Sequence, residues 1–350
     1  MKKALFLIFF ITFIIANGAD DGSYIEKKFV TGMSPAAVTV DDKENIYIAD
    51  RFTMSILKYN SKGEYLYSFG IRNEKKENQN FYPTDVFYHD NKIYVLDING
   101  RIFIFTVNGR LLIKRKYKKG KMVGDLVGAK SIFVDDEYIY CTDSGNNRIQ
   151  IFEKDGGLKT TFGYKGDYSG NLSYPEGIAV NGEDIVIADT GNDVLAVFGK
   201  NGIFKFELDP DNGEKEKKFS FKSPRGVAVD DEGKIYVIDS GNNRVQVYNK
   251  EYKLLYTFGE NRKNKANVTG ITDIWGKNGK IYIADNSKRR VKVYDKDMKL
   301  IVVIGRDIIV EIAGKAVLII IVIICAVLLL RREKKYTGDD ADGKQSYRSI

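Results

Sequence analysis

Cysteine and histidine are scarce in this sequence, which has two cysteines and one histidine among 350 residues. Cys141 lies in a strand-like run and Cys325 in an apolar run near the C-terminus, so no disulfide between them is expected. The histidine, His89, lies in a turn-like stretch with no nucleophile evident beside it. A zinc site with several histidine ligands is therefore excluded, and a Ser-His-Asp triad is disfavoured. We expect no catalytic residue and no metal ligand, which favours a non-enzymatic role.

A large excess of charge of one sign is also missing from most of the chain. The formal net charge is +8. Lys2 and Lys3 supply +2 of it, and the seven basic and four acidic residues from Lys315 onward supply +3, which leaves about +3 for the region between. Surfaces that bind nucleic acid carry a much denser basic patch. We therefore expect no nucleic-acid partner.

Long apolar runs occur only near the two ends. A positive start followed by an apolar run and small residues predicts a secretory signal peptide over residues 1–18. Residues 312–330 contain one charge, Lys315, and as a helix would span about 28 Å, enough to cross a bilayer. The basic residues that follow would remain cytoplasmic. The pattern predicts a single-pass type I membrane protein, with the lipid bilayer as partner of this transmembrane helix and residues 331–350 as a cytoplasmic tail.

Between the two ends, one pattern restarts six times. Six runs rich in Val, Ile and Tyr each end in an aspartate, at spacings of 47, 46, 46, 50 and 46 residues: Asp50, Asp97, Asp143, Asp189, Asp239 and Asp285. A period in the forties with strand-forming residues predicts propeller blades. One sheet of this size cannot bury both faces, so neighbouring blades must pack around an axis. We predict an all-β fold, a six-bladed β-propeller of four-stranded antiparallel blades over residues 24–305, with blades near 34–70, 82–117, 128–163, 174–208, 223–259 and 267–305.

The fifth copy of the pattern is the clearest. It reads SPRGVAVD over residues 223–230 and IYVIDSGNNRVQV over residues 235–247. This pattern resembles the NHL repeat of six-bladed β-propellers, and the resemblance covers roughly residues 34–305. That family includes scaffolds, sensor ectodomains, RNA binders and a few enzymes, so the resemblance implies the fold and leaves the activity open. We expect the Asp, Asn and Arg of each turn to be structural, namely the six aspartates above together with Arg148 and Arg244.

The residues that begin the inner strand of each blade should converge on the central channel. In an antiparallel blade this end of the inner strand shares a face with the Asp-Ser-Gly-Asn-Asn turns and the longer inserts, where recognition usually occurs. The sequence there mixes charges of both signs, which favours a polar binding surface over a cation cage. The candidate binding residues of the channel and its rim are Thr84, Asp85, Lys130, Glu176, Arg225, Thr269 and Tyr168. We expect no cofactor, with calcium held by channel carboxylates as the alternative.

These features favour a membrane-tethered, extracytoplasmic scaffold that binds a protein, peptide or glycan outside the membrane. One alternative is a calcium-dependent, lactonase-like hydrolase that uses the channel carboxylates Asp85 and Glu176. A second alternative is a sensor ectodomain that signals through the short tail. Either residues 24–32 or the C-terminal hairpin that includes residues 299–305 could close the ring. The hairpin is favoured because its partner strand is four residues away.

Overall fold

The computed structural model describes residues 23–26, 32–71, 81–208, 218–259 and 270–305. The chain divides into the units Met1–Arg306 and Asp307–Ile350, and every described residue belongs to the first. The predicted signal peptide (1–18), transmembrane helix (312–330) and tail (331–350) lie outside the described residues. Within the described ranges, no helix has the length and apolar character needed to cross a membrane.

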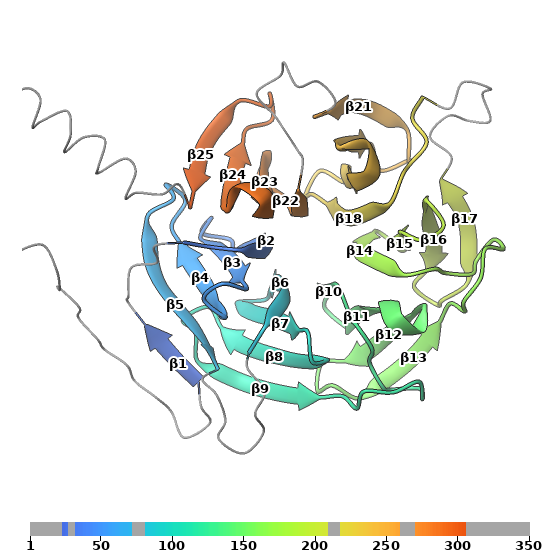
Figure 1. The fold of residues 1–350 in the computed structure, drawn as a ribbon, viewed down its shortest axis with the longest axis horizontal. Helices are drawn as coiled ribbons and strands as arrows, with labels where there is room; N and C mark the ends of the chain where they lie inside the picture. Colours follow the sequence, from blue (N-terminus) through green and yellow to red (C-terminus); the bar gives the residue numbers. More distant parts are fainter. Residues whose placement is uncertain (1–22, 27–31, 72–80, 209–217, 260–269, 306–350) are drawn as a thin grey trace, which may run out of the picture. The chain divides into compact units, whose positions relative to one another are not determined.

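The described residues form six antiparallel sheets arranged around one axis, as predicted (Figure 1). Blade one contains β2 (Pro35–Val40), β3 (Ile46–Asp50), β4 (Ser55–Tyr59) and β5 (Tyr65–Ile71). Blade two contains β6 (Pro83–His89), β7 (Lys92–Asp97), β8 (Arg101–Thr106) and β9 (Leu111–Lys116). Blade three contains β10 (Ile132–Val134), β11 (Tyr138–Asp143), β12 (Arg148–Glu153) and β13 (Leu158–Phe162).

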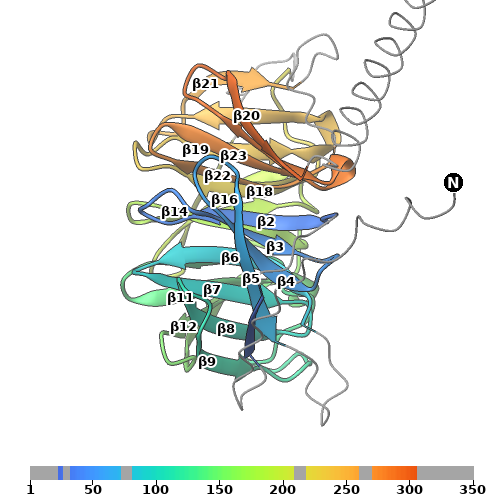
Figure 2. The same cartoon turned by 90° about the vertical axis from the view of Figure 1, so that its left-hand side faces the viewer.

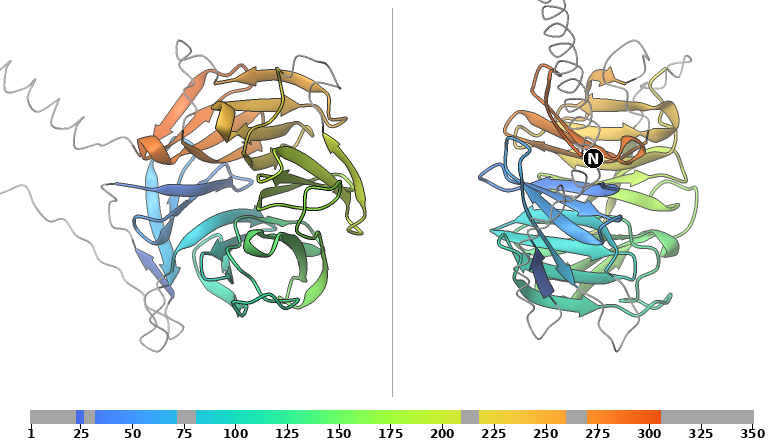
Figure 3. Two further views of the ribbon diagram at one scale, coloured as in Figure 1. Left: turned by 45° about the vertical axis from the view of Figure 1, so that its right-hand side comes forward. Right: turned by 60° about the vertical axis from the view of Figure 1, so that its left-hand side comes forward.

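The second half of the ring repeats this plan. Blade four contains β14 (Pro175–Asn181), β15 (Asp184–Asp189), β16 (Val194–Gly199) and β17 (Phe204–Leu208). Blade five contains β18 (Pro224–Val229), β19 (Ile235–Asp239), β20 (Arg244–Tyr248) and β21 (Leu254–Phe258). Blade six contains β22 (Ile271–Lys277), β23 (Lys280–Asp285), β24 (Arg290–Tyr294) and β25 (Leu300–Ile304). The six sheets can be followed round the ring in Figure 3.

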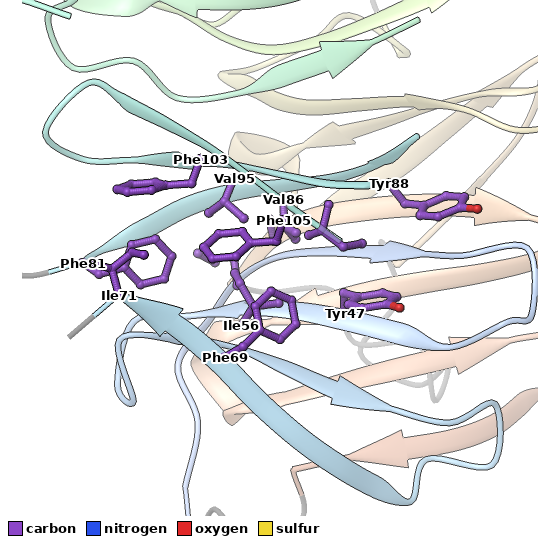
Figure 4. Close-up of a cluster of buried hydrophobic side chains, with 14 residues drawn as sticks. Tyr47, Ile56, Phe69, Ile71, Phe81, Val86, Tyr88, Val95, Phe103 and Phe105 are labelled. Carbon is purple, nitrogen blue, oxygen red and sulfur yellow. The ribbon is translucent and has the colours of Figure 1, made fainter. Parts of the chain in front are cut away.

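Side-chain burial decreases from the strands near the axis to the outermost strand of a blade. All five residues of β3 are buried, whereas the outer strand β9 has no fully buried residue. The inner strands are covered on both faces because each blade packs between two others, which explains their nearly continuous apolar sequences. Between blades one and two, for example, Phe69 packs against Phe105 with ring centroids 5.2 Å apart (Figure 4). Apolar packing between blades therefore holds the ring together.

The C-terminal hairpin completes blade six, as predicted, because β25 pairs with β24. A strand near the N-terminus, β1 (Ser23–Glu26), does not close the ring. It pairs with the outer strand β5 and gives blade one a fifth strand, which Figures 1 and 2 show outside the other four. Blade six joins blade one by side-chain packing, in which Val38 and Ile48 share a buried cluster with Tyr282 and Val291.

The aspartates that end the second strands are all buried and accept hydrogen bonds from the following turn. In blade five, Asp239 accepts from the Arg244 Nε at 2.6 Å, the Asn242 Nδ2 at 2.9 Å and the Gln246 Nε2 at 3.0 Å. In blade three, Asp143 accepts from the Arg148 Nε at 2.7 Å. These contacts fix the turn between the second and third strands, and therefore position the loops on that face of the ring.

Candidate functional site

A pocket of about 220 Å³ lies on the ring axis, where the inner strands begin. All six blades contribute to its lining. The turns between second and third strands lie on the same face. In blade four, for example, the Thr190 Oγ1 of this turn donates to the carbonyl of Pro224, next to the pocket residue Arg225, at 2.6 Å. We call this pocket the mouth pocket.

Charges of opposite sign alternate around the mouth pocket. Blades one, three and five supply the cations Arg51, Lys130 and Arg225. Blades two, four and six supply the carboxylic acids Asp85, Glu176 and Asp273. Asp85 and Asp273 also line a smaller cavity of about 30 Å³ next to the pocket, whereas the other four line the mouth pocket alone. The charged residues therefore form an outer layer of three cations and Glu176, with a deeper layer of two aspartates.

Asp85 joins blade two to blade three. Its Oδ2 accepts from the backbone N–H of Ile132 in blade three at 2.7 Å, and its Oδ1 accepts from the N–H of Val86 at 2.8 Å. Burial raises the pKa of Asp85 to about 6, against the lowering effect of these hydrogen bonds and of the Arg51 charge. Asp85 is therefore both a pocket residue and a link between blades.

Asp273 makes the same kind of link from blade six to blade one. Its Oδ2 accepts from the backbone N–H of Val38 at 2.8 Å. Burial raises the pKa of Asp273 well above its ordinary value, and the negative charge of Asp85 raises it further. Two like charges in one desolvated region oppose each other, so full ionisation of both deep aspartates is disfavoured at neutral pH.

The cations of the outer layer are only partly neutralised. Arg225 lies 3.7 Å from Glu176, measured from Nε to Oε2. Burial lowers the pKa of Arg51, and the charges of Asp85 and Glu176 counteract this effect. Among the residues that the structure describes, no hydrogen bond or ion pair joins the side chain of Arg51 or Lys130 to another group. Both residues have solvent-exposed surface at the mouth, although the Arg51 guanidinium is partly desolvated.

Aromatic side chains surround the deeper cavity. The ring centroid of Phe87 lies 4.8 Å from that of Phe133 and 4.8 Å from that of Trp275, in both cases edge to face. These residues line the cavity of about 30 Å³ together with apolar residues of blades four and five. This volume is about that of one water molecule in the liquid, so the deeper cavity is much smaller than the mouth pocket.

Exposed aromatic residues lie on the same face as the mouth pocket. Phe52 directly follows Arg51 and is 61% exposed, and Tyr174 directly precedes β14 and is 60% exposed. Tyr164 and Tyr168, in the insert between blades three and four, are 77% and 79% exposed. Tyr174 has a φ of 48°, and its N–H donates to the Asn147 Oδ1 at 2.9 Å. We call these four residues the aromatic rim.

The structure brings five of the predicted binding residues together in the mouth pocket: Thr84, Asp85, Lys130, Glu176 and Arg225. Tyr168 lies in the aromatic rim, and Thr269 lies outside the described residues. In blade six, Thr272 and Asp273 line the pocket. Ile271 pairs with Asp285 just as Pro83 pairs with Asp97, so Thr272-Asp273 corresponds to Thr84-Asp85. Counting back from the repeat aspartate would have identified Asp273.

Arg51 was also missed, because it belongs to the turn after β3 and not to an inner strand. His89 lies at the other end of β6 from the mouth, four residues after Asp85, which corresponds to roughly 13 Å along a strand. Its Nε2 lies 3.1 Å from an oxygen of Asp136. Burial lowers the pKa of His89. In the described ranges, no group of three or more His, Cys, Asp or Glu side chains is placed to hold a metal ion.

Comparisons with known proteins identify the repeat and the fold. The family model described as NHL repeat matches residues 221–248, which include β18 to β20 of blade five. No curated protein gives a significant match. A virginiamycin B lyase from Staphylococcus aureus aligns at 13% identity over 79% of this chain and 87% of its own, with a TM-score of 0.54.

Other solved structures give similar values. A streptogramin B lyase aligns at 13% identity over 82% of this chain and 89% of its own, with a TM-score of 0.55. A chain of a nidogen/laminin complex aligns at 16% identity over 72% of this chain and 90% of its own, with a TM-score of 0.51. At such identities the likeness shows the fold alone. The chain is thus a six-bladed β-propeller that contains an NHL repeat in its fifth blade.

Proposed function

We propose that this propeller is a membrane-tethered, extracytoplasmic scaffold that binds a protein, peptide or glycan ligand at the face that contains the mouth pocket. The observation that carries the proposal is the combination found on that face. A polar pocket, lined by all six blades, is accompanied by an exposed aromatic rim. Polar groups on a rigid frame provide specificity, and exposed Tyr and Phe side chains provide contact area at low entropic cost.

The membrane tether rests on the sequence. Residues 1–18 have the pattern of a signal peptide, and residues 312–330 have the length and composition of a single transmembrane helix followed by basic residues. This topology would hold the propeller outside the cytoplasmic membrane. The test is protease digestion of intact cells, in which we expect the propeller to be degraded and the tail to be protected. Degradation of the propeller only after lysis would contradict the proposed location.

Binding is a better account of the mouth pocket than catalysis. The two deep aspartates accept backbone hydrogen bonds from neighbouring blades, and the only histidine is at the other end of its strand. A calcium-dependent hydrolase would need several oxygen ligands free to bind the ion. Thermal melting with calcium and with a chelator tests this alternative, and an increase in melting temperature that depends on calcium would favour it. An output lost on deletion of residues 334–350, with ligand binding retained, would favour the sensor alternative.

The aromatic rim provides a test of the binding function. The immobilised full-length chain would be incubated with the envelope fraction of its own cells, and the retained material would be quantified. We expect the double variant Tyr164→Ala/Tyr168→Ala to retain at least about tenfold less material, since buried aromatic anchors dominate binding energy. The matched control is Leu300→Ala, because Leu300 is 47% exposed at the start of the outer strand β25 in blade six, away from the insert between blades three and four.

Two outcomes decide the proposal. Loss of retention in the rim variant with normal retention in the Leu300→Ala control supports it. Equal retention by the wild type, the rim variant and the control would contradict a ligand site on this face. Treatment of the envelope fraction with protease or with glycosidase then shows whether the retained ligand is a protein, a peptide or a glycan.

A further inference from the structure

The outer layer of the mouth pocket has more positive than negative charge. Arg51, Lys130 and Arg225 face a single outer carboxylate, Glu176. That carboxylate is 3.7 Å from Arg225, and its side chain is 23% exposed. One carboxylate cannot neutralise three cations, so the outer layer has a formal excess of two positive charges.

The two deep aspartates remove only part of this excess. Each of them accepts a backbone N–H from the neighbouring blade, which uses part of its hydrogen-bonding capacity within the fold. Burial raises the pKa of both aspartates, and the charge of Asp85 further opposes ionisation of Asp273. The pair therefore supplies less than two full negative charges at neutral pH.

The size of the mouth pocket limits what can enter it. Sites for drug-sized ligands usually have volumes of about 300–1,000 Å³. A volume of about 220 Å³ is smaller, and it suits one functional group or one small ring. Arginine and lysine are the residues that proteins use to hold carboxylate, phosphate and sulfate groups, through charge-assisted hydrogen bonds.

We propose that the mouth pocket is an oxyanion site that takes a carboxylate, phosphate or sulfate group of the ligand, with Arg51 and Lys130 as its main donors and Arg225 as a third. This inference rests on the proposed function, since it names the chemistry that the same face recognises. The aromatic rim would then contact the part of the ligand that remains outside the pocket. The alternation of charge limits the site further, because a ligand oxygen near Arg225 would also approach Glu176.

Small probes test the site without knowledge of the natural ligand. Binding of inorganic phosphate, inorganic sulfate and glucuronate to the full-length chain would be measured by calorimetry, with glucose as the neutral match for glucuronate. Sodium chloride would keep the ionic strength constant, since surface electrostatics is screened by salt. We expect saturable binding of at least one oxyanion probe and none of glucose. Phosphate or sulfate binding alone would assign a phosphorylated or sulfated ligand, and glucuronate binding alone would assign a carboxylate.

Three single variants assign the site to named residues. Lys130→Gln removes an exposed charge and is expected to weaken probe binding by about tenfold or more. Glu176→Gln removes the outer carboxylate and is expected to tighten binding severalfold, a gain that a misfolded variant would not give. Lys253→Gln, in the exposed turn between β20 and β21 on the other face, is expected to leave binding unchanged.

The inference is overturned if no oxyanion probe binds the wild-type chain, or if Lys130→Gln and Glu176→Gln bind the probe as the wild type does. The proposed function is still supported in either case if the Tyr164→Ala/Tyr168→Ala variant retains less envelope ligand than the wild type. Conversely, probe binding that is lost in Lys130→Gln supports the oxyanion site even if the rim variants retain envelope ligand normally. The two failures are therefore distinguishable.

Discussion

The repeat aspartate faces an arginine in blade five but a valine in blade four, and this contrast gives a testable prediction. Asp239 in blade five pairs with Arg244, which is 4% exposed. In blade four the residue opposite Asp189 is Val194, so the equivalent aspartate has no arginine. Among the described residues, the Asp189 carboxylate accepts hydrogen bonds from the Ser173 N–H at 2.7 Å and the Asn192 Nδ2 at 2.7 Å, and neither donor is charged. Substitution of each aspartate by asparagine therefore tests what the buried charge contributes.

Asp239→Asn is expected to destabilise the protein strongly. The substitution leaves Arg244 as a buried cation without its counter-charge, and loss of one partner of a buried pair typically costs about 3–5 kcal/mol. The guanidinium also donates to the carbonyls of Lys218 and Ser220, at 3.0 Å each, so these hydrogen bonds remain. We therefore expect Asp239→Asn to lower the free energy of unfolding by about 3 kcal/mol, at both pH 5 and pH 8.

Asp189→Asn is expected to have a pH-dependent effect of the opposite sign. Burial raises the pKa of Asp189 to about 6 from 3.8, partly offset by the hydrogen bonds from Ser173 and Asn192, and the charge of Glu207 raises it slightly. Because the folded pKa is raised, the stability of the wild type is greatest below pH 3.8 and falls as the pH rises through about 6. The total loss is about 3 kcal/mol, of which about 1.4 kcal/mol falls between pH 5 and pH 8.

The asparagine variant avoids this loss but gives up one charge-assisted hydrogen bond, worth about 1.5 kcal/mol at the lower end of the range for charged groups. We expect Asp189→Asn to be nearly neutral at pH 5 and to stabilise the protein by about 1–2 kcal/mol at pH 8. The assay is guanidinium unfolding at both pH values, followed by the fluorescence of Trp275, the one tryptophan of the chain. The reasoning is refuted if Asp189→Asn is more destabilising at pH 8 than at pH 5, or if both variants lose equal stability.

Three further changes test the packing. Phe87→Ala removes a ring that contacts Phe133 and Trp275, so it should lower the free energy of unfolding in guanidinium by about 3–5 kcal/mol. It should also shift the fluorescence emission of Trp275, and an unchanged spectrum would contradict that contact. Gly109→Ala should lower the free energy of unfolding by about 2 kcal/mol or more, because a Cβ there would lie 2.8 Å from Phe69 at a φ of +84°. Gly182 has a φ of +62° with open space around it, so the control Gly182→Ala should lower it by about 1 kcal/mol. Burial raises the pKa of the fully buried Cys141. Peptide mapping should therefore find Cys141 alkylated by iodoacetamide in denaturant and protected in the native chain. Equal alkylation rates in the two conditions would place Cys141 at the surface.

Most of the fold was predictable from the sequence because each blade carries its own complete signal. The six aspartates mark the ends of the second strands, and the spacing between them is nearly constant. Local hairpins within each blade leave few alternatives for pairing. The partner of β1 was not predictable in the same way. Its pairing with β5 is an edge contact about 45 residues away in sequence, and no turn signal specifies it.

The candidate site was predictable where the start of the inner strand is regular. The register shifts by one residue at this point in five blades, but the irregular stretch differs in length. In blades four and five the shift spans three residues, for example from Pro175 to Ile178, whereas in blade six it spans two, from Ile271 to Asp273. The Gly-Ile pair of blade six resembles the Gly-Ile and Gly-Val pairs of blades four and five, which led to Thr269 in place of Thr272. The distance back from Asp285 is the better guide, because Thr272 and Asp273 precede it by the same numbers of residues as Thr84 and Asp85 precede Asp97.

The double role of Asp85 and Asp273 has a consequence for how such a propeller can diverge. In the described part of the chain, the exposed side chains of Arg51 and Lys130 form no hydrogen bond or ion pair with another blade, so a lineage can exchange them one at a time as its target changes. Replacement of either deep aspartate also loosens the junction with the next sheet, at Ile132 or at Val38. New ligand specificities should therefore arise first in the outer layer of the pocket, while the two deep aspartates remain under selection because they hold neighbouring blades together.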